Sequence, residues 1–353
     1  MLGAGITGWS VGTSVFQGNG DPLSAKLAEW GRDHGLSAVV TALEAIQYKL
    51  NPPKTGGKPN TSWLAGVGTA TKPKPHADVV MQTALTPIVT PAIAGEGEFK
   101  ALIVHNGLPV IQVAYLRPDS VHTSYLAAVV WMSQSHTKLV LHPGYSDPGN
   151  TSLFGQPDYI PNSPGNGLIA TFNAGFKIKD SRGGFYANGH TAGVLTAGAA
   201  SVVTYSDGHT NVGAWGSEVT MSPNVVSVRQ NLKLLIDNGQ LSPTLSGDVQ
   251  TTWGATLGGA YDVWRSGIGV TAKGDLVYVI GNALSVRSLA GLLKTAGAVR
   301  AMQLDINYLW TSYMWYTPTT AGTLSPHKVV DFVRPADRYL SPTSRDFFAV
   351  YYR

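Results

Sequence analysis

Residues 298–311 read AVRAMQLDINYLWT, and the way this stretch begins and ends predicts both a core element and a candidate site. Its first seven residues are almost all apolar, which is typical of a buried strand. The run stops at Asp305, and Asn307 follows two residues later. A carboxylate at the end of a buried strand is a candidate general acid or base, or a ligand for a cation or a sugar hydroxyl. The alternative is that Asp305 only caps a turn that begins there.

The sequence around this stretch predicts a core of short strands. A helix is expected directly before it, between Ser285 and Gly297, because apolar residues recur on one face and serine is a favourable N-cap. Strands are expected where short apolar runs lie between turn residues. These runs are ALIVHNGLPVIQVAYL (101–116), which reads as two strands, YLAAVVWM (125–132), TKLVLH (137–142), GLIATF (167–172), SVVTY (201–205) and GDLVYVI (274–280).

The N-terminal part of the chain has a different pattern. Residues 21–51 predict two consecutive helices, which begin at an Asp-Pro pair and stop at Asn-Pro-Pro. Residues 54–74 are rich in Gly, Pro, Thr and Lys and predict a surface connection. We therefore expect a helical N-terminal arm with this connection over residues 1–80, and an α+β domain over residues 81–353. In that domain we expect a mixed β-sheet core with packed helices.

Composition excludes several classes of site. The 353-residue chain contains no cysteine, which excludes disulfides, thiolate catalysis and cysteine-based zinc or iron–sulfur sites. The net charge is +4 and the basic residues are not interleaved with aromatic ones, so nucleic acid is not an expected partner. No uncharged apolar run reaches about 18 residues, so we expect no membrane-spanning segment. The start, MLGAGITGWSV, shows no basic region or cleavage site of a signal peptide.

Two further polar residues lie in strand-like segments. Asn173, in ATFNAGFK, follows an apolar run and either meets a ligand or caps the turn. Arg265, in YDVWRSGIGV, must pair or face a cleft, because a guanidinium inside an apolar strand is costly when it is alone. Guanidinium matches phosphate or carboxylate oxygens. A structural ion pair between Arg265 and Asp305 would explain both residues without catalysis.

Histidine spacing gives no metal pattern. The nine histidines are scattered without a pair at i and i+4, and nothing in their spacing indicates a metal site. A divalent cation such as calcium is a possible cofactor at Asp305, where a cation would help to hold the substrate. His209 follows Asp207-Gly208 in an expected hairpin turn. We include His209 and Lys177 among the candidate substrate-binding residues.

Six segments of the chain together carry a family resemblance. They are ATFNAGF (170–176), GGFYANG (183–189), NLKLLIDNGQ (231–240), WRSGIGVTAKGDLVYVIG (264–281), GAVRAMQLD (297–305) and RDFFAVYY (345–352). Taken in order, they resemble the phosphodiester glycosidase domain family, which includes the lysosomal uncovering enzyme and bacterial proteins described as exopolysaccharide-related. The resemblance covers roughly residues 97–353, and the N-terminal arm is similar to a region that precedes this domain in exported or membrane-anchored actinobacterial proteins.

The resemblance implies three catalytic residues and a substrate class. Asn173, Arg265 and Asp305 fall on matching family positions, and the resemblance implies that they converge around a sugar phosphate. It also implies an extracytoplasmic location, secreted or at the cell surface. A second carboxylate is expected for glycoside hydrolysis, and Asp262 and Asp207 are the candidates.

The chain departs from the family pattern directly after Asp305. The family has Gly-Gly-Gly-Ser there, whereas this chain continues with Ile-Asn-Tyr-Leu-Trp. A glycine loop lets backbone amides approach a phosphate closely, and bulky residues would block that approach. Tyr308 and Trp310 would instead stack on a sugar, and Asn307 would replace part of the lost hydrogen bonding.

We therefore expect a hydrolase that cleaves a glycosyl phosphodiester or a related glycosidic linkage in a cell-surface or extracellular glycan. In this mechanism Arg265 binds phosphate, Asp305 acts as acid or base or holds the substrate with a cation, and Asn173 orients the substrate. The alternative is a non-catalytic surface protein that binds polysaccharide or assembles with itself through the same cleft. The expected partner is a glycan or a sugar phosphate, and the sequence indicates no oligomeric state.

Overall fold

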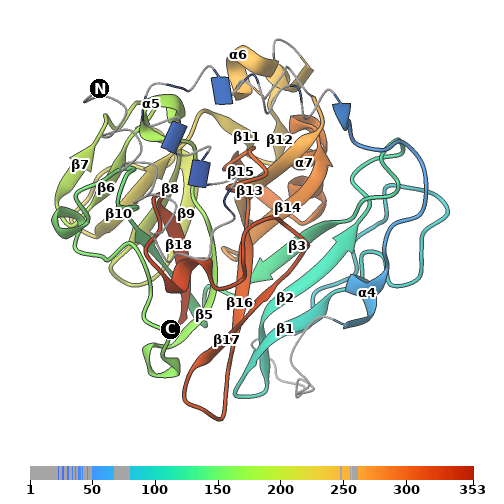
Figure 1. Cartoon of the computed structure of the whole chain (residues 1–353), viewed down its shortest axis with the longest axis horizontal. Helices are drawn as coiled ribbons and strands as arrows, with labels where there is room; N and C mark the ends of the chain where they lie inside the picture. Colours follow the sequence, from blue (N-terminus) through green and yellow to red (C-terminus); the bar gives the residue numbers. More distant parts are fainter. Residues whose placement is uncertain are drawn as a thin grey trace, which may run out of the picture.

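The computed structural model describes scattered positions between residues 23 and 50, and then residues 51–66, 80–246, 249–254, 256 and 261–353. In this part of the chain the dominant elements are three β-sheets in which every strand pairing is antiparallel (Figure 1). The eight-stranded sheet has the order β1 (Lys100–His105), β2 (Leu108–Leu116), β3 (Ala127–Met132), β14 (Leu276–Leu284), β13 (Val263–Thr271), β15 (Ala298–Gln303), β11 (Leu234–Asp237) and β12 (Gln240–Leu241).

The other two sheets have five strands each. The first, here the β10 sheet, has the order β7 (His190–Ala192), β6 (Phe185–Ala187), β10 (Val225–Gln230), β8 (Ala200–Tyr205) and β9 (Thr210–Ala214). The second, here the β5 sheet, has the order β17 (Leu324–Lys328), β16 (Tyr313–Pro318), β5 (Leu168–Asn173), β18 (Phe347–Tyr352) and β4 (Thr137–His142).

From residue 51 onward, the described helices are few and short. They are α4 (Ser62–Gly66), α5 (Ile178–Ser181), α6 (Val249–Trp253) and α7 (Val286–Thr295), with short 3-10 turns that include Arg338–Leu340. The helix α7 packs on β13, β14 and β15 (Figure 1). The serine predicted to cap it does so: Ser285 Oγ accepts a hydrogen bond from the Ser288 amide, and Ser288 Oγ accepts one from the Ser285 amide.

The strands predicted from sequence are present in the structure. The run 101–116 forms β1 and β2, and its turn residues Asn106 and Gly107 have positive φ values of 51° and 84°. Positive φ at both central positions is what a tight two-residue hairpin requires, and Asn-Gly adopts it at low cost. The other five predicted runs correspond to β3, β4, β5, β8 and β14.

The expected fold class, a mixed sheet with packed helices, is wrong. The structure is mostly antiparallel sheet, and a second sheet covers the core where helices were expected. Phe172 of β5 lies with its ring centroid 4.9 Å from that of Tyr278 in β14, so the β5 sheet packs on the eight-stranded sheet. Continuous apolar runs such as β2 are buried along their whole length, and such a run does not reveal whether a helix or a sheet covers it.

The expected arm and connection lie partly outside the described residues. Most residues of the two helices expected over residues 21–51 lie outside the described residues. The helical arm therefore stays an expectation. The connection is anchored to the sheet domain at several described points. At one of them Leu64 of α4 is buried and Trp63 lies 6.5 Å from Tyr115 of β2 between ring centroids. Among the described residues, no helix combines the length and the apolar character that crossing a membrane requires.

Candidate functional site

Asp305 lies two residues after the end of strand β15, in a buried position between the sheets. The pairing of β15 with β13 continues beyond the strand, since the Leu304 amide donates to Ser266 O at 2.8 Å and the Ser266 amide donates to Asp305 O at 2.9 Å. The Asp305 residue is only 4% exposed. A carboxylate removed from water in this way must be compensated by neighbouring donors or charges.

The two oxygens of the Asp305 carboxylate have different partners. Its Oδ1 accepts hydrogen bonds from the amides of Ile306 at 2.8 Å and Asn307 at 2.9 Å. Its Oδ2 lies 3.6 Å from Nη2 of Arg345, which is itself only 6% exposed. Asp305 therefore caps the turn with one oxygen, as the alternative interpretation expected, and faces an arginine with the other.

Asn173 lies beside Asp305 and is joined to it by one hydroxyl group. Asn173 Nδ2 donates to Ser266 Oγ at 2.9 Å, and the same Oγ accepts from the Asp305 amide at 3.2 Å. On its other side, Asn173 Oδ1 accepts from Tyr278 Oη at 2.8 Å and from the Ser312 amide at 3.0 Å. The structure thus brings two of the three expected catalytic residues together, through Ser266.

Arg265 is not part of this group. Neighbouring residues of a strand point to opposite faces, so Arg265 points away from the face that carries Ser266. The Arg265 side chain is fully buried. It donates to Leu284 O at 2.8 Å, to Gln303 Oε1 at 2.9 Å and to Tyr261 O at 3.2 Å.

Three other arginines surround the indole of Trp310 near Asp305. Their Cζ atoms lie 4.5 Å (Arg334), 5.0 Å (Arg338) and 5.1 Å (Arg345) from the ring centroid. All three are buried, and none was predicted from the sequence as a site residue. The signal that could have indicated them is the position of charged residues in VRPADRYL (333–340) and RDFFAVYY (345–352), in a chain with only 13% charged residues.

This arginine cluster brings three buried guanidinium groups around Trp310, and Arg345 lies close to Asp147 as well as to Asp305. Among the described residues, Nε and Nη1 of Arg338 are buried without a hydrogen-bond partner. Buried guanidinium groups in this arrangement match the oxygens of a phosphate or carboxylate. Burial raises the pKa of Asp305 above its usual range, although Arg345 and the two turn amides oppose this effect.

The main chain at Gly144 crosses close to the main chain at Ser344 and Arg345, and this crossing holds the segment that carries Arg345. A Cβ atom on Gly144 would lie 2.3 Å from Ser344 O, so only glycine allows the segments to approach this closely. Asp147, three residues later, lies 3.8 Å from Arg345 Nε and accepts the Ile178 amide at 3.1 Å. The crossing therefore places Arg345 relative to Asp305.

The predicted substrate-binding residues near Asp305 lie in or beside turns. The Asn307 side chain accepts the Leu309 amide at 2.9 Å and so shapes the turn itself. Tyr308 is partly exposed and packs on Trp310, whereas Trp310 is only 5% exposed under its arginines. Lys177 is partly exposed at the start of α5, next to the Ile178 amide that Asp147 holds.

His209 and Asp207 lie at the opposite end of β15. His209 lines a hollow of about 700 Å³ together with Arg300, near the start of that strand, whereas Asp305 follows its end. The side chains of His209 and Asp207 are 44% and 62% exposed, and Nδ1 lies 2.6 Å from Oδ1. The predicted hairpin turn is present between β8 and β9. The structure thus does not bring these two residues to Asp305.

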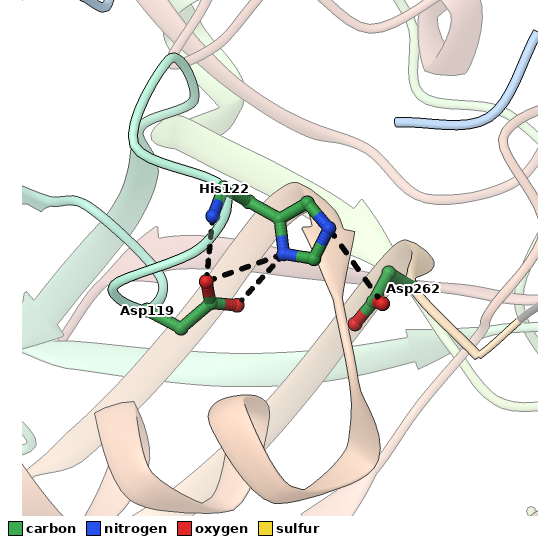
Figure 2. A group of neighbouring side chains, drawn as sticks. All are labelled: Asp119, His122 and Asp262. Carbon is green, nitrogen blue, oxygen red and sulfur yellow. Dashed lines mark hydrogen bonds and ion pairs between the residues drawn. The ribbon is translucent and has the colours of Figure 1, made fainter. Parts of the chain in front are cut away.

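Asp262, the other candidate second carboxylate, immediately precedes β13 and lies beside a histidine. Its Oδ2 is 3.7 Å from Nε2 of His122, whose Nδ1 is 3.0 Å from Asp119 Oδ2 (Figure 2). Burial raises the pKa of Asp262, and the nearby Asp119 charge adds to this while His122 opposes it. Burial acts in the same sense on Asp119, but hydrogen bonds from His122 and Val121 outweigh it and lower the pKa of that carboxyl.

Comparison with known proteins gives a family match for the centre of the chain. Residues 166–305 match the family described as phosphodiester glycosidase, which confirms the resemblance over that range. The matched range includes Asn173, Arg265 and Asp305 and ends before Arg345. The match supports a hydrolase of the phosphodiester glycosidase type. No curated protein sequence matches the chain.

Solved structures with similar backbones share little sequence with this chain. The catalytic domain of zebrafish N-acetylglucosamine-1-phosphodiester α-N-acetylglucosaminidase, auto-inhibited by its pro-peptide, is 14% identical over 72% of this chain and 88% of its own, with a TM-score of 0.44. A hypothetical protein from Synechocystis is 14% identical over 70% and 63%, with a TM-score of 0.37. A protein of Burkholderia pseudomallei described as exported is 12% identical over 64% and 74%, with a TM-score of 0.29.

Proposed function

We propose that this chain, whose residues 166–305 match the phosphodiester glycosidase family, hydrolyses a glycosyl phosphodiester in an extracytoplasmic glycan. The observation that carries the proposal is the contact between Asp305 and Arg345, next to two more buried arginines around Trp310. A buried carboxyl group beside several buried guanidinium groups suits a substrate that places an anionic phosphate next to the bond that breaks.

In the proposed mechanism the arginines bind the phosphate. Arg345 and Arg338 donate hydrogen bonds to its oxygens and stabilise the charge that grows there as the bond between the anomeric carbon and the phosphate oxygen breaks. Water forms the new bond to the anomeric carbon as the old bond breaks and loses a proton to solvent, so that the products are the free sugar and a phosphate monoester anion. We assign this role to Arg345 in place of the expected Arg265, because Arg265 already donates to three protein acceptors on the other face of β13.

Asp305 is proposed as the acid that assists bond cleavage. Its raised pKa keeps the carboxyl protonated to higher pH than in an exposed aspartate, so that it can transfer a proton to the leaving oxygen. Asn173 is proposed as a positioning residue, because its amide holds Ser266 and, through it, the main chain at Asp305. Asp305 and Arg345 are enclosed, so substrate entry requires a local opening of the structure.

The alternative, a protein that binds polysaccharide without cleaving it, needs exposed aromatic faces at the same place. Trp310 is 5% exposed and its ring is surrounded by guanidinium groups. A sugar can therefore not stack on it in this arrangement. A local opening would be needed for either function, and we favour the hydrolase because residues 166–305 match the phosphodiester glycosidase family.

The test compares the hydrolysis of sugar 1-phosphodiesters with that of simple glycosides of the same sugars. We expect turnover of at least one phosphodiester, and a loss of about 10²- to 10⁴-fold in the Asp305→Asn variant. Asp207→Asn is the matched control, because it removes an exposed carboxylate at the other end of β15. Circular dichroism verifies the fold of each variant.

Two outcomes would contradict the proposal. One is that the wild-type protein cleaves the glycosides as fast as the phosphodiesters, because the arginines would then have no phosphate to recognise. The other is that a folded Asp305→Asn variant keeps the turnover of the Asp207→Asn control.

A further inference from the structure

A second group of titratable side chains lies outside the Asp305 site. It consists of Asp119 and His122, in the loop after β2, and Asp262, directly before β13 (Figure 2). One possible ligand atom from each residue lies within 4.8 Å of the other two. In the part of the chain that the structure describes, this is the one group of three such residues close enough to hold a metal ion.

The tautomer of His122 is set by Asp119. Asp119 Oδ1 accepts the amides of Val121 at 2.8 Å and His122 at 2.7 Å, and these bonds fix the carboxylate. The same carboxylate faces Nδ1 of the imidazole at 3.0 Å, so Nδ1 carries a proton and donates it. A carboxylate that orients an imidazole through one nitrogen leaves the other nitrogen directed at a metal in many protein sites.

The other side of the imidazole faces a carboxylate without a direct hydrogen bond. With the proton on Nδ1, Nε2 of neutral His122 presents a lone pair, and it faces Asp262 Oδ2 at 3.7 Å (Figure 2). Either a proton on Nε2 or a bound cation between the two atoms removes the repulsion between them. In its neutral form the arrangement therefore offers a cation one nitrogen and one oxygen ligand on facing side chains.

The distance between His122 Nε2 and Asp262 Oδ2 fits two ligands of a small divalent ion. Zinc binds imidazole nitrogen and carboxylate oxygen at about 2.0–2.2 Å, and two such ligands on a tetrahedral ion lie about 3.3–3.6 Å apart. The observed 3.7 Å requires only a small movement. Imidazole suits zinc and similar transition metals, whereas calcium prefers oxygen ligands alone.

The group of Asp119, His122 and Asp262 is accessible to a cation from solvent, and its ligands are held in place by the surrounding chain. The side chains of Asp119 and Asp262 are 29% and 24% exposed, which gives a cation and its water ligands access. The loop with His122 is held by the connection segment, because the Gly56 amide donates to Val121 O at 2.7 Å. Pre-organised ligands lose little entropy when the ion binds.

We propose that His122 Nε2 and the Asp262 carboxylate bind a divalent transition-metal ion of the zinc class, with Asp119 as the positioning residue. Water completes the coordination. Neither the family match nor the proposed hydrolysis depends on this site, and Asp305 is not part of it.

The test is calorimetric titration of the chelator-treated full chain with zinc chloride, supported by the shift in melting temperature. We expect one ion per chain and a higher melting temperature, because the ion binds only the folded state. Asp262→Asn and Asp119→Asn should each weaken binding by about 10- to 100-fold. Calcium chloride is expected to bind more weakly than zinc.

The matched control is His209→Ala. Asp207 and His209 form a similar contact between Nδ1 and a carboxylate at 2.6 Å but are not within such a group of three in the described chain. Zinc binding that survives in His209→Ala and is lost in His122→Ala supports the site. Unchanged affinity in Asp262→Asn, equal affinity for calcium, or no zinc binding by the wild-type chain would overturn it.

Discussion

The two ends of β15 are built in opposite ways. At the end near Asp305, charged side chains are buried and are held by partners from other sheets and from distant parts of the chain. At the other end, around the hollow lined by His209, the side chains of Asp207 and His209 are exposed and contact each other within one turn. Both ends are rich in titratable groups.

The difference indicates where chemistry is expected. Exposed ion pairs contribute little to stability and form readily in any turn. Buried charges are costly, so a fold that retains several of them at one place has a structural or functional reason. Titratable groups are present at both ends, so their presence alone does not separate the ends, whereas burial does.

The largest expected effect is the loss in the free energy of unfolding when a buried ion pair at the Asp305 end is broken. Arg229 of β10 is fully buried and pairs with Asp346, the residue after Arg345. Arg229→Met leaves the Asp346 carboxylate unpaired, and we expect a loss of about 3–5 kcal/mol in the free energy of unfolding. Urea denaturation at neutral pH measures it.

The control for this change is Arg353→Met at the hollow. Arg353 is exposed and donates to the carbonyl oxygens of Gln134 and Asp207. We expect a loss below about 1 kcal/mol. Equal losses in Arg229→Met and Arg353→Met would remove the contrast between the two ends.

The second effect is a pH dependence that originates from the buried end. His142 pairs with Phe347 across β4 and β18, and Phe347 pairs with Asn173. Burial lowers the pKa of His142 from 6.5 to about 4, opposed by its hydrogen bond to Pro157 O. Between these values the unfolded chain binds a proton that the folded chain does not.

Stability should therefore fall as the pH falls from 6.5 to about 4, by about 3 kcal/mol from this one group. Urea denaturation at several pH values measures the slope. In His142→Asn, which keeps a donor but does not titrate, this part of the slope should disappear. A slope that is the same in both proteins would show that other groups cause it.

The third and smallest effect concerns the crossing that places Arg345. Gly144→Ala inserts a methyl group 2.3 Å from a main-chain oxygen, and we expect a loss of about 1–3 kcal/mol. Turnover of the phosphodiester should fall as well, because Arg345 is displaced from Asp305. Thermal unfolding and the hydrolysis assay measure the two effects.

Gly291→Ala is the matched control for this change. Gly291 lies in α7, and an added Cβ atom would have no neighbour within 4 Å. Alanine has the higher helix propensity, so we expect a gain of about 0.5–1 kcal/mol with turnover unchanged. Normal stability and turnover in Gly144→Ala would show that the crossing does not set the position of Arg345.

The sequence predicted the strands well because their signals are local. Apolar runs between turn residues located the six predicted regions, and Asn106-Gly107 predicted a hairpin that the structure contains. What covers those strands depends on contacts between distant segments, such as Phe172 with Tyr278, and no local pattern contains that information. The expected fold class was wrong for this reason, although the helix predicted between Ser285 and Gly297 is present and packs on the eight-stranded sheet.

The residues around Asp305 were predictable from the sequence only where a local pattern marks them. Asp305 and Asn173 end buried runs, and this local feature singled them out as candidates; the structure places them together through Ser266, and their catalytic roles stay predictions. Arg345 was missed because its partner Asp305 lies 40 residues away and only the fold brings them together. Asp119 and His122 were missed because their third partner, Asp262, lies in another part of the chain.

The strand β18 follows all other strands in sequence, yet it lies inside the β5 sheet, between β5 and β4. During synthesis, β5 and β4 therefore leave the ribosome well before β18, the strand that pairs with both of them. Arg345 lies two residues before β18 and is synthesised with it. Until then Asp305 has no Arg345 to face, and two strands have unpaired edges of the kind that aggregate. A nascent chain that has already made Asp305 is consequently still without its charge cluster, and it is at this stage that chaperones would have most to protect.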